Sequence, residues 1–202
     1  MPMSENMKTP RIPLLSAEEI AKIGVEAGIP PELHDRNIFR ILFQSPRVAK
    51  ALQGLLYAQL FDSAFDGRLR ELVIMRIGWK TNCEYEWVQH WYTALKAFGC
   101  TEQDLLEVRD WQASTHLGAA EKAVLAATDE VISTGTISDE TWARCEQNLE
   151  GTEARLELVF AIATWHAVSL MLRCIKVPVE ADTVSWPPDG CSPEDFARGV
   201  SR

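Results

Sequence analysis

The chain has 202 residues, of which 47% are hydrophobic and 24% charged, as is ordinary for a globular protein with one sizeable core. The net charge is −9, and Lys and Arg are scattered along the chain instead of forming a basic stripe. Because a nucleic acid repels an acidic surface, the composition argues against a nucleic-acid-binding protein.

The sequence also lacks features of exported and membrane proteins. No apolar run approaches the roughly 18–20 residues that a membrane helix needs, and the N-terminal MPMSENMKTP has no apolar segment typical of a secretory signal. The five cysteines are widely spaced and include no Cys-x-x-Cys pair. We therefore expect a cytoplasmic protein with free thiols and no membrane contact.

The first part of the chain predicts an arm followed by helices. Residues 1–13 are polar and contain prolines, which favours a flexible N-terminal arm. Ser16 and Glu19 form a capping box, and Gly28 ends that first helix. Further helices are predicted over 31–45, 46–61 and 68–79. The helix over 68–79 is apolar on most sides, so we expect it to be central and largely buried.

The rest of the chain continues in helices and ends in a tail. Thr81 and Glu84 predict a second capping box, and Thr101 caps a short helix. The predicted helices span about 82–98, 101–109, 119–134, 138–150 and 152–175. Pro178 stops the last of these, and residues 178–202 predict an extended C-terminal tail. No segment alternates with a period of two, so the fold class is all-α: one helical-bundle domain over 1–202 with about eight helices.

One faint internal repeat stands out. ELVIMRIGW at 71–79 resembles ELVFAIATW at 157–165, with Glu and Trp at the same offset. The simpler interpretation is two buried helices that share common residues. The alternative is a duplicated helical hairpin.

The segment KTNCEYEWVQHW, residues 80–91, concentrates chemically active side chains. On a helix, Cys83, Glu86 and His90 stand at i, i+3 and i+7 and so share one face. Cys83 is expected in the first turn, where the helix dipole lowers the pKa of a thiol. Glu71 lies on the preceding antiparallel helix, in an otherwise apolar setting, and needs a partner such as His90 or Arg68. A carboxylate and a buried histidine together suit proton transfer near neutral pH.

These residues resemble a known family. RELVIMRIGWKTNCEYEWVQH, residues 70–90, is similar to the carboxymuconolactone decarboxylase family, whose redox branch is alkyl hydroperoxidase D. That branch has a Glu, then Cys-x-x-Cys, then a His four residues later. Glu71, Cys83 and His90 match this pattern, whereas Glu86 stands in place of the second cysteine. The chain thus resembles members that lack the thiol pair. A local thiol–disulfide cycle cannot close, because Cys100 lies about 25 Å along the same predicted helix.

The resemblance implies a decarboxylase-like enzyme that needs no cofactor and acts on a small carboxylated lactone or keto acid. His90 is then the general acid or base, and Glu71 and Glu86 orient it and tune its pKa. The implied substrate-binding residues are Arg76 or Arg68 for a carboxylate, and Trp79, Trp87, Trp91 and Tyr57 as walls of a dry pocket. Lactone hydrolysis and isomerisation can use the same relay. The resemblance further implies trimers or hexamers, and the apolar helices over 68–79 and 152–175 also favour a homo-oligomer.

Several alternatives stay open at this point. A single-cysteine thiol peroxidase can use Cys83 with an external thiol, and a non-enzymatic helical scaffold can keep the fold without the chemistry. Glu86 and His90 offer two metal ligands at helical spacing, and Glu71 or His166 can add a third, but the sequence has no H-E-x-x-H or paired E-x-x-H set, so no metal is expected. His166 is a second histidine candidate, although packing is the simpler interpretation, and His34 and His116 are expected at the surface. Arg70 is expected to form a surface pair with a nearby acid.

Overall fold

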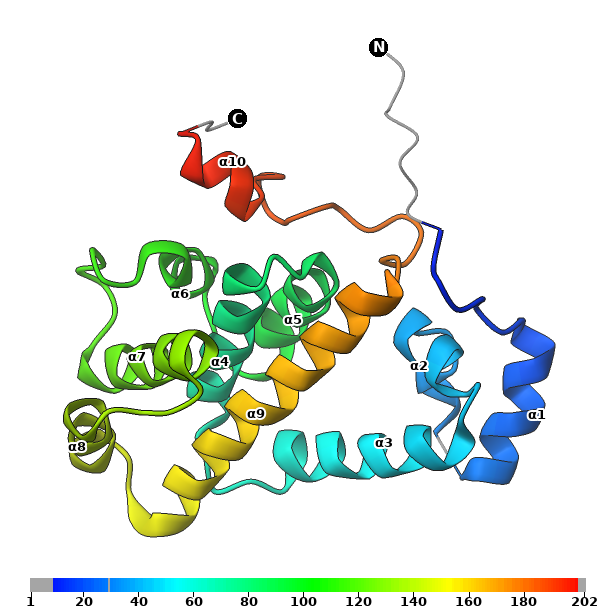
Figure 1. The fold of residues 1–202 in the computed structure, drawn as a ribbon, viewed down its shortest axis with the longest axis horizontal. Coiled ribbons are helices and arrows are strands. Elements are labelled where there is room, and N and C mark those ends of the chain that lie inside the picture. Colours follow the sequence, from blue (N-terminus) through cyan, green and yellow to red (C-terminus); the bar gives the residue numbers. More distant parts are fainter. Residues whose placement is uncertain (1–8, 29, 200–202) are drawn as a thin grey trace.

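The structure is a computed structural model, and it describes residues 9–28 and 30–199. Within these residues it contains ten α-helices, two short 3₁₀ helices and no β-strand, which confirms the all-α prediction (Figure 1). The helices are α1 (Ala17–Ala27), η1 (Pro31–Leu33), α2 (Asn37–Leu42), α3 (Pro46–Phe61), α4 (Gly67–Lys80), α5 (Glu84–Ala97), α6 (Glu102–Glu107), η2 (Val108–Asp110), α7 (Ala119–Thr134), α8 (Asp139–Asn148), α9 (Gly151–Ile175) and α10 (Pro193–Ala197).

Helix α4 is the centre of the molecule. It packs against α5, α7 and α9, which surround it in Figure 1. All residues from Leu69 to Trp79 are buried, as its apolar sequence predicts. Asp66 caps the helix by accepting a hydrogen bond from the Leu69 N–H at 2.9 Å. A central helix buried on all sides can place a polar side chain such as Glu71 where water does not reach it.

The turn between α4 and α5 differs in detail from the prediction. Thr81 does not cap α5, because its hydroxyl instead donates to the Ile77 carbonyl at 2.7 Å. Asn82 takes a left-handed conformation with φ 53°, and Cys83 becomes the N-cap residue of α5. The two helices lie so close that a Cβ on Gly78 would sit 3.2 Å from the Trp87 backbone nitrogen. This close approach brings Glu71 and His90 within contact distance.

Helix α9 crosses the face of α4 and α5 diagonally (Figure 1). By length and composition it is the one helix of the described chain that is apolar enough to cross a membrane, yet almost half of its most apolar stretch is buried inside this fold. Its buried side includes Leu158, Ile162 and Trp165. Gln59 of α3 donates to the Thr164 hydroxyl at 2.9 Å and ties α3 to this helix.

The N-terminal helices form a smaller lobe with its own apolar cluster of Ile20, Phe39, Leu42, Phe43 and Ala49. The predicted capping box of α1 is confirmed, with Gly28 in the left-handed conformation after the helix. The single helix predicted over 31–45 is wrong. The chain forms η1 and α2 there, with an extended backbone at Arg36 between them.

Both ends of the described chain are held by the helices. Residues 1–8 of the predicted arm lie outside the described residues, but Arg11 donates from its N–H to the Ile175 carbonyl at 2.7 Å. In the tail, Trp186 is buried beside Trp79 and Trp87, and the Trp87 indole donates to the Pro187 carbonyl at 2.8 Å. The tail is therefore not extended throughout, because α10 forms within it.

Candidate active site

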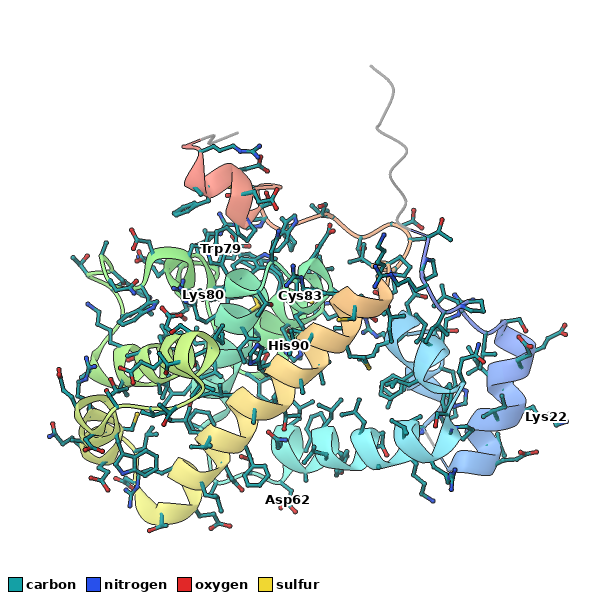
Figure 2. The ribbon with its side chains drawn as sticks, viewed as in Figure 1. Lys22, Asp62, Trp79, Lys80, Cys83 and His90 are labelled. Atoms are coloured by element: carbon teal, nitrogen blue, oxygen red, sulfur yellow. The ribbon has the colours of Figure 1, made fainter. Side chains whose placement is uncertain are left out.

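His90 and Glu71 form the centre of the site. Figure 2 labels His90 and Cys83 where α5 passes behind α9. The Nδ1 atom of His90 lies 2.8 Å from the Glu71 Oε2 atom, and Glu71 is fully buried. Burial lowers the pKa of His90, but the Glu71 carboxylate more than offsets this effect, so the pKa lies above its usual value. The sequence-predicted pairing of these two residues is present in the structure.

Glu86 approaches the same imidazole from the other ring nitrogen. Its Oε2 atom lies 3.6 Å from His90 Nε2, one helical turn away on α5. Burial raises the pKa of Glu86 to about 7, and nearby Glu71 adds to the rise although His90 opposes it. A carboxyl group with this pKa is present in both protonation states near neutral pH, as a general acid requires.

Trp165 of α9 completes the surroundings of His90. Its indole N–H donates to His90 Nε2 at 3.2 Å, and the two rings meet edge to face. A nitrogen that accepts a hydrogen bond carries no proton, so the neutral ring must hold its proton on Nδ1, toward Glu71.

Arg70 lies behind Glu71, and its predicted position at the surface is wrong. It is 2% exposed, its Nη2 atom lies 3.6 Å from Glu71 Oε1, and it donates to the Gln59 carbonyl at 2.9 Å. Several buried polar atoms of this group make no hydrogen bond to described residues: Glu71 Oε1, Arg70 Nε and Nη2, and Gln59 Oε1. Unsatisfied buried polar groups are costly, and their concentration around one carboxylate is typical of a functional centre.

Cys83 does not have the environment that the sequence predicted. The thiol is 2% exposed and packs in an apolar cluster with Ile41, Val168 and Leu172. Burial raises the pKa of Cys83 to about 12, and the Glu86 carboxylate adds to this. The expected lowering by the helix dipole is therefore wrong, because desolvation of the thiolate outweighs it.

The two arginines expected to bind a substrate carboxylate have other partners. Arg76 is buried and forms a two-pronged ion pair with Asp129 of α7, at 2.7 Å for each contact. Its remaining amino group donates to the carbonyls of Val108 and Arg109. Arg68 pairs with Asp104 and Glu121 at 2.6 and 2.7 Å. Both are structural ion pairs, so neither guanidinium is free for a substrate.

The aromatic residues expected to line a pocket also have other positions. Trp79 and Trp87 are buried against each other, with Arg109 over both rings, and the tail covers them. Tyr57 is 58% exposed on α3, and its ring packs beside Phe61. Trp91 is buried next to Trp87.

The other histidines stand apart from this centre. His116 contacts Asp104 at 2.8 Å, and His34 packs edge to face against Phe43. His166 is partly buried on α9. No group of three metal-ligating side chains gathers within the described residues.

Two surface hollows lie away from His90. One, of about 490 Å³, lies under Phe196 and beside Arg109, and the other, of about 610 Å³, lies along Val48 and Leu55 of α3. The His90 side chain itself is 13% exposed.

Sequence reasoning missed two members of the site. Trp165 occupies the Trp position of the internal repeat, but its contact with His90 depends on the crossing of α9 over α5, which short-range sequence signals do not show. Arg70 directly precedes Glu71 in the sequence, and the apolar run around both residues is the available signal for its burial.

One protein-family model matches the part of the chain that carries this site. Residues 46–130, which include Glu71, Cys83, Glu86 and His90, match the carboxymuconolactone decarboxylase family. No curated protein matches the sequence.

Three solved structures share the fold. A peroxidase-related protein from Ralstonia eutropha JMP134, described as an alkylhydroperoxidase AhpD core, has a TM-score of 0.69 and 14% identity, over 86% of this chain and 94% of that one. A peroxidase-related protein from Silicibacter sp. TM1040 has a TM-score of 0.69 and 11% identity, over 90% and 97%. A cysteine-to-alanine variant of the debrominase Bmp8, in complex with 2,3,4-tribromopyrrole, has a TM-score of 0.67 and 16% identity, over 89% and 95%.

The match covers the helices that carry the His90 centre, and the structural likeness extends over most of the chain. The resemblance noted in the sequence is thereby confirmed: residues 46–130 match the model of the carboxymuconolactone decarboxylase family, and the fold is that of the AhpD-like proteins.

Proposed function

We propose that this protein is a cofactor-free lyase or hydrolase that acts on a small carboxylated lactone or keto acid. The observation that carries the proposal is the imidazole of His90 held between two buried carboxyl groups, at 2.8 Å from Glu71 and 3.6 Å from Glu86. A histidine and two acids with different roles suit proton transfer to and from carbon or oxygen. The match of residues 46–130 to the carboxymuconolactone decarboxylase family supports the same class of reaction.

In a decarboxylation the bond between the carboxylate carbon and the ring carbon breaks, and CO₂ leaves. The electron pair moves into the conjugated carbonyl as an enolate. The protonated Glu86, whose pKa is about 7, gives its proton to that carbon and becomes a carboxylate. His90 then returns a proton to Glu86 from solvent, while the Glu71 carboxylate stabilises the imidazolium that forms.

A thiol peroxidase or dehalogenase is the second candidate, because the fold is shared with peroxidase-related proteins and a debrominase. In this chain Cys83 is the only cysteine in the His90 region of α5 that matches the family pattern. Such chemistry needs a thiolate, and the burial that raises the pKa of Cys83 to about 12 opposes it. The acid–base enzyme is therefore the better supported function.

The test is CO₂ release and ring opening with a panel of carboxylated lactones and keto acids. We expect His90→Ala, Glu71→Gln and Glu86→Gln each to reduce kcat at least about 100-fold while the circular dichroism spectrum stays native. Glu157→Gln is the matched control, because Glu157 occupies the place of Glu71 in the repeat but accepts hydrogen bonds from Ser63 and the Phe65 N–H instead. Full activity in the His90 and Glu71 variants would refute the relay.

We also propose that the chain forms a homo-oligomer, as a trimer or hexamer. Exposed apolar side chains on the outer face of α9 support this, with Leu156 56% and Phe160 53% exposed. Phe61 on α3 is 66% exposed. Sedimentation of the Phe160→Glu variant, compared with the parent protein, tests the assembly, and a parent protein that sediments as a monomer would contradict it.

A further inference from the structure

The Nε2 atom of His90 is the only ring nitrogen that can reach a reacting group. Nδ1 is committed to Glu71, which is fully buried on the inner side of the ring. Nε2 faces Glu86 and the indole N–H of Trp165. Since the proposed relay must use Nε2, the group that is hydrogen-bonded to Nε2 before substrate binds controls the relay.

Trp165 is the group that is hydrogen-bonded to Nε2. The indole N–H lies 3.2 Å from Nε2, Trp165 is 2% exposed, and its ring stands at 84° to the imidazole. An indole nitrogen can only donate a hydrogen bond, and an imidazolium has no acceptor. The contact therefore exists only with the neutral ring, and a proton on Nε2 must break it.

We propose that Trp165 is a positioning residue of this site: its indole N–H holds His90 in the tautomer protonated on Nδ1 and covers Nε2 until a substrate displaces it. The role rests on the proposed function for its catalytic meaning, but the hydrogen bond itself can be tested without any substrate. The hydrogen bond from Trp165 on α9 also fixes the orientation of the His90 ring on α5, so that Nε2 stays next to the Glu86 carboxyl group.

Charged groups around His90 also influence its pKa. Glu71 and Arg70 face it from α4, and Glu86 faces it from α5, whereas α9 contributes the uncharged indole. Glu71 and Glu86 favour the imidazolium, whereas Arg70 opposes it. Trp165 stabilises the neutral ring, so removal of its donor must make His90 more basic.

The experiment is titration of the imidazole ¹⁵N resonances of the full-length chain by NMR, with His90 assigned from its loss in His90→Ala. We expect the parent protein to show a protonated Nδ1 and an unprotonated Nε2 above the titration midpoint, and the Trp165 indole proton to move with that midpoint. Trp165→Phe keeps a ring in place but has no donor. Its His90 midpoint should rise by about one pH unit, the equivalent of one hydrogen bond.

Trp87→Phe is the matched control, because it also removes a buried indole hydrogen bond, to Pro187, away from His90. An unchanged His90 midpoint in Trp165→Phe, or a proton on Nε2 of the neutral parent ring, would overturn the inference. If Trp165→Phe does not fold, the tautomer and the indole shift of the parent protein decide the question alone. If the hydrogen bond is confirmed but the protein turns over none of the substrates, the positioning of His90 by Trp165 stands. The proposed function is then rejected.

Discussion

Glu71, His90 and Glu86 differ in how the cost of their burial is compensated. Glu71 and His90 satisfy each other at 2.8 Å, so their pairing offsets part of the cost of their burial. Glu86 has only the longer 3.6 Å approach to His90, and no hydrogen bond from another described side chain compensates its burial. A carboxyl group kept under these conditions destabilises the fold whenever it ionises, which is a common property of residues retained for reactivity.

The stability of Glu86→Gln should therefore depend on pH. The pKa of Glu86 rises from an ordinary value near 4.5 to about 7 on folding, so the folded protein binds more protons than the unfolded chain between these values. The parent protein thus loses stability as the pH rises through this window, and the Gln variant does not. We expect Glu86→Gln to be more stable at pH 8 by about 3 kcal/mol and nearly equal at pH 4.5. Urea unfolding at both pH values checks this, and equal differences at the two pH values would contradict it.

The reactivity of Cys83 should be low in the native protein. With a pKa of about 12, on the order of one thiol in 10⁴ is ionised at pH 8, and the sulfur is also buried. Cys174 is exposed and provides the internal comparison. In a time course of iodoacetamide labelling followed by peptide mass spectrometry, Cys174 should react first and Cys83 only after denaturation. Labelling of both at similar rates would favour the thiol peroxidase.

At the scale of helices, α4 connects the site to the rest of the fold. Its inner residue Glu71 faces α5, whereas Arg76, about one and a half turns later, faces α7 and η2. The same helix therefore carries Glu71, the partner of His90, on one side and the buried Arg76–Asp129 ion pair on another. Changes on the α7 side should affect stability and leave the chemistry of the folded protein intact.

Arg76→Ala and Arg68→Ala distinguish these roles. Loss of Arg76 leaves Asp129 without its buried partner and two carbonyls without donors, so we expect a loss of about 3 kcal/mol or more in the free energy of unfolding. Arg68 is 30% exposed, and its loss should cost about 1 kcal/mol. Denaturant unfolding measures both. A selective rise in KM at full stability in Arg76→Ala would restore the substrate-binding role that the structure rejects.

The helices and the Glu71–His90 pair were predictable because they depend on short-range signals. Helical periodicity, caps and a short turn between two helices are enough to bring residue 71 opposite residue 90. The surroundings of Cys83 were not predictable, because Ile41 and Val168 come from helices distant in sequence. The partner of Arg76 is 53 residues away, and nothing near Arg76 in the sequence identifies it. Long-range packing thus decided which candidate residues are structural.

At the scale of the whole molecule, the tail completes the core. Trp186 enters an aromatic cluster with Trp79 and Trp87, and Asp189 forms a bidentate ion pair with Arg109 at 2.7 and 2.9 Å. Asn82 donates to Glu194 at 3.0 Å, which holds α10 against the α4–α5 turn. The tail therefore supports the two helices that carry Glu71 and His90.

Trp186→Ala should be much more damaging than Phe196→Ala. Trp186 is 7% exposed and its removal leaves a cavity, whereas Phe196 is 45% exposed. We expect a loss of about 3 kcal/mol in unfolding free energy for Trp186→Ala and less than about 1 kcal/mol for Phe196→Ala. Thermal and urea unfolding of both variants test this, and a similar small loss in both would show that the tail contributes little.

Trp79 and Trp87, which pack against Trp186 in the folded protein, are translated long before Trp186. Trp87 and Pro187, which share a hydrogen bond, are separated by 100 residues in the chain. During synthesis on the ribosome, the aromatic surface of Trp79 and Trp87 is thus uncovered until the segment around Trp186 and Pro187 has emerged. Until then this aromatic surface is exposed on an incompletely folded chain, and such exposed apolar surface makes folding intermediates prone to aggregation.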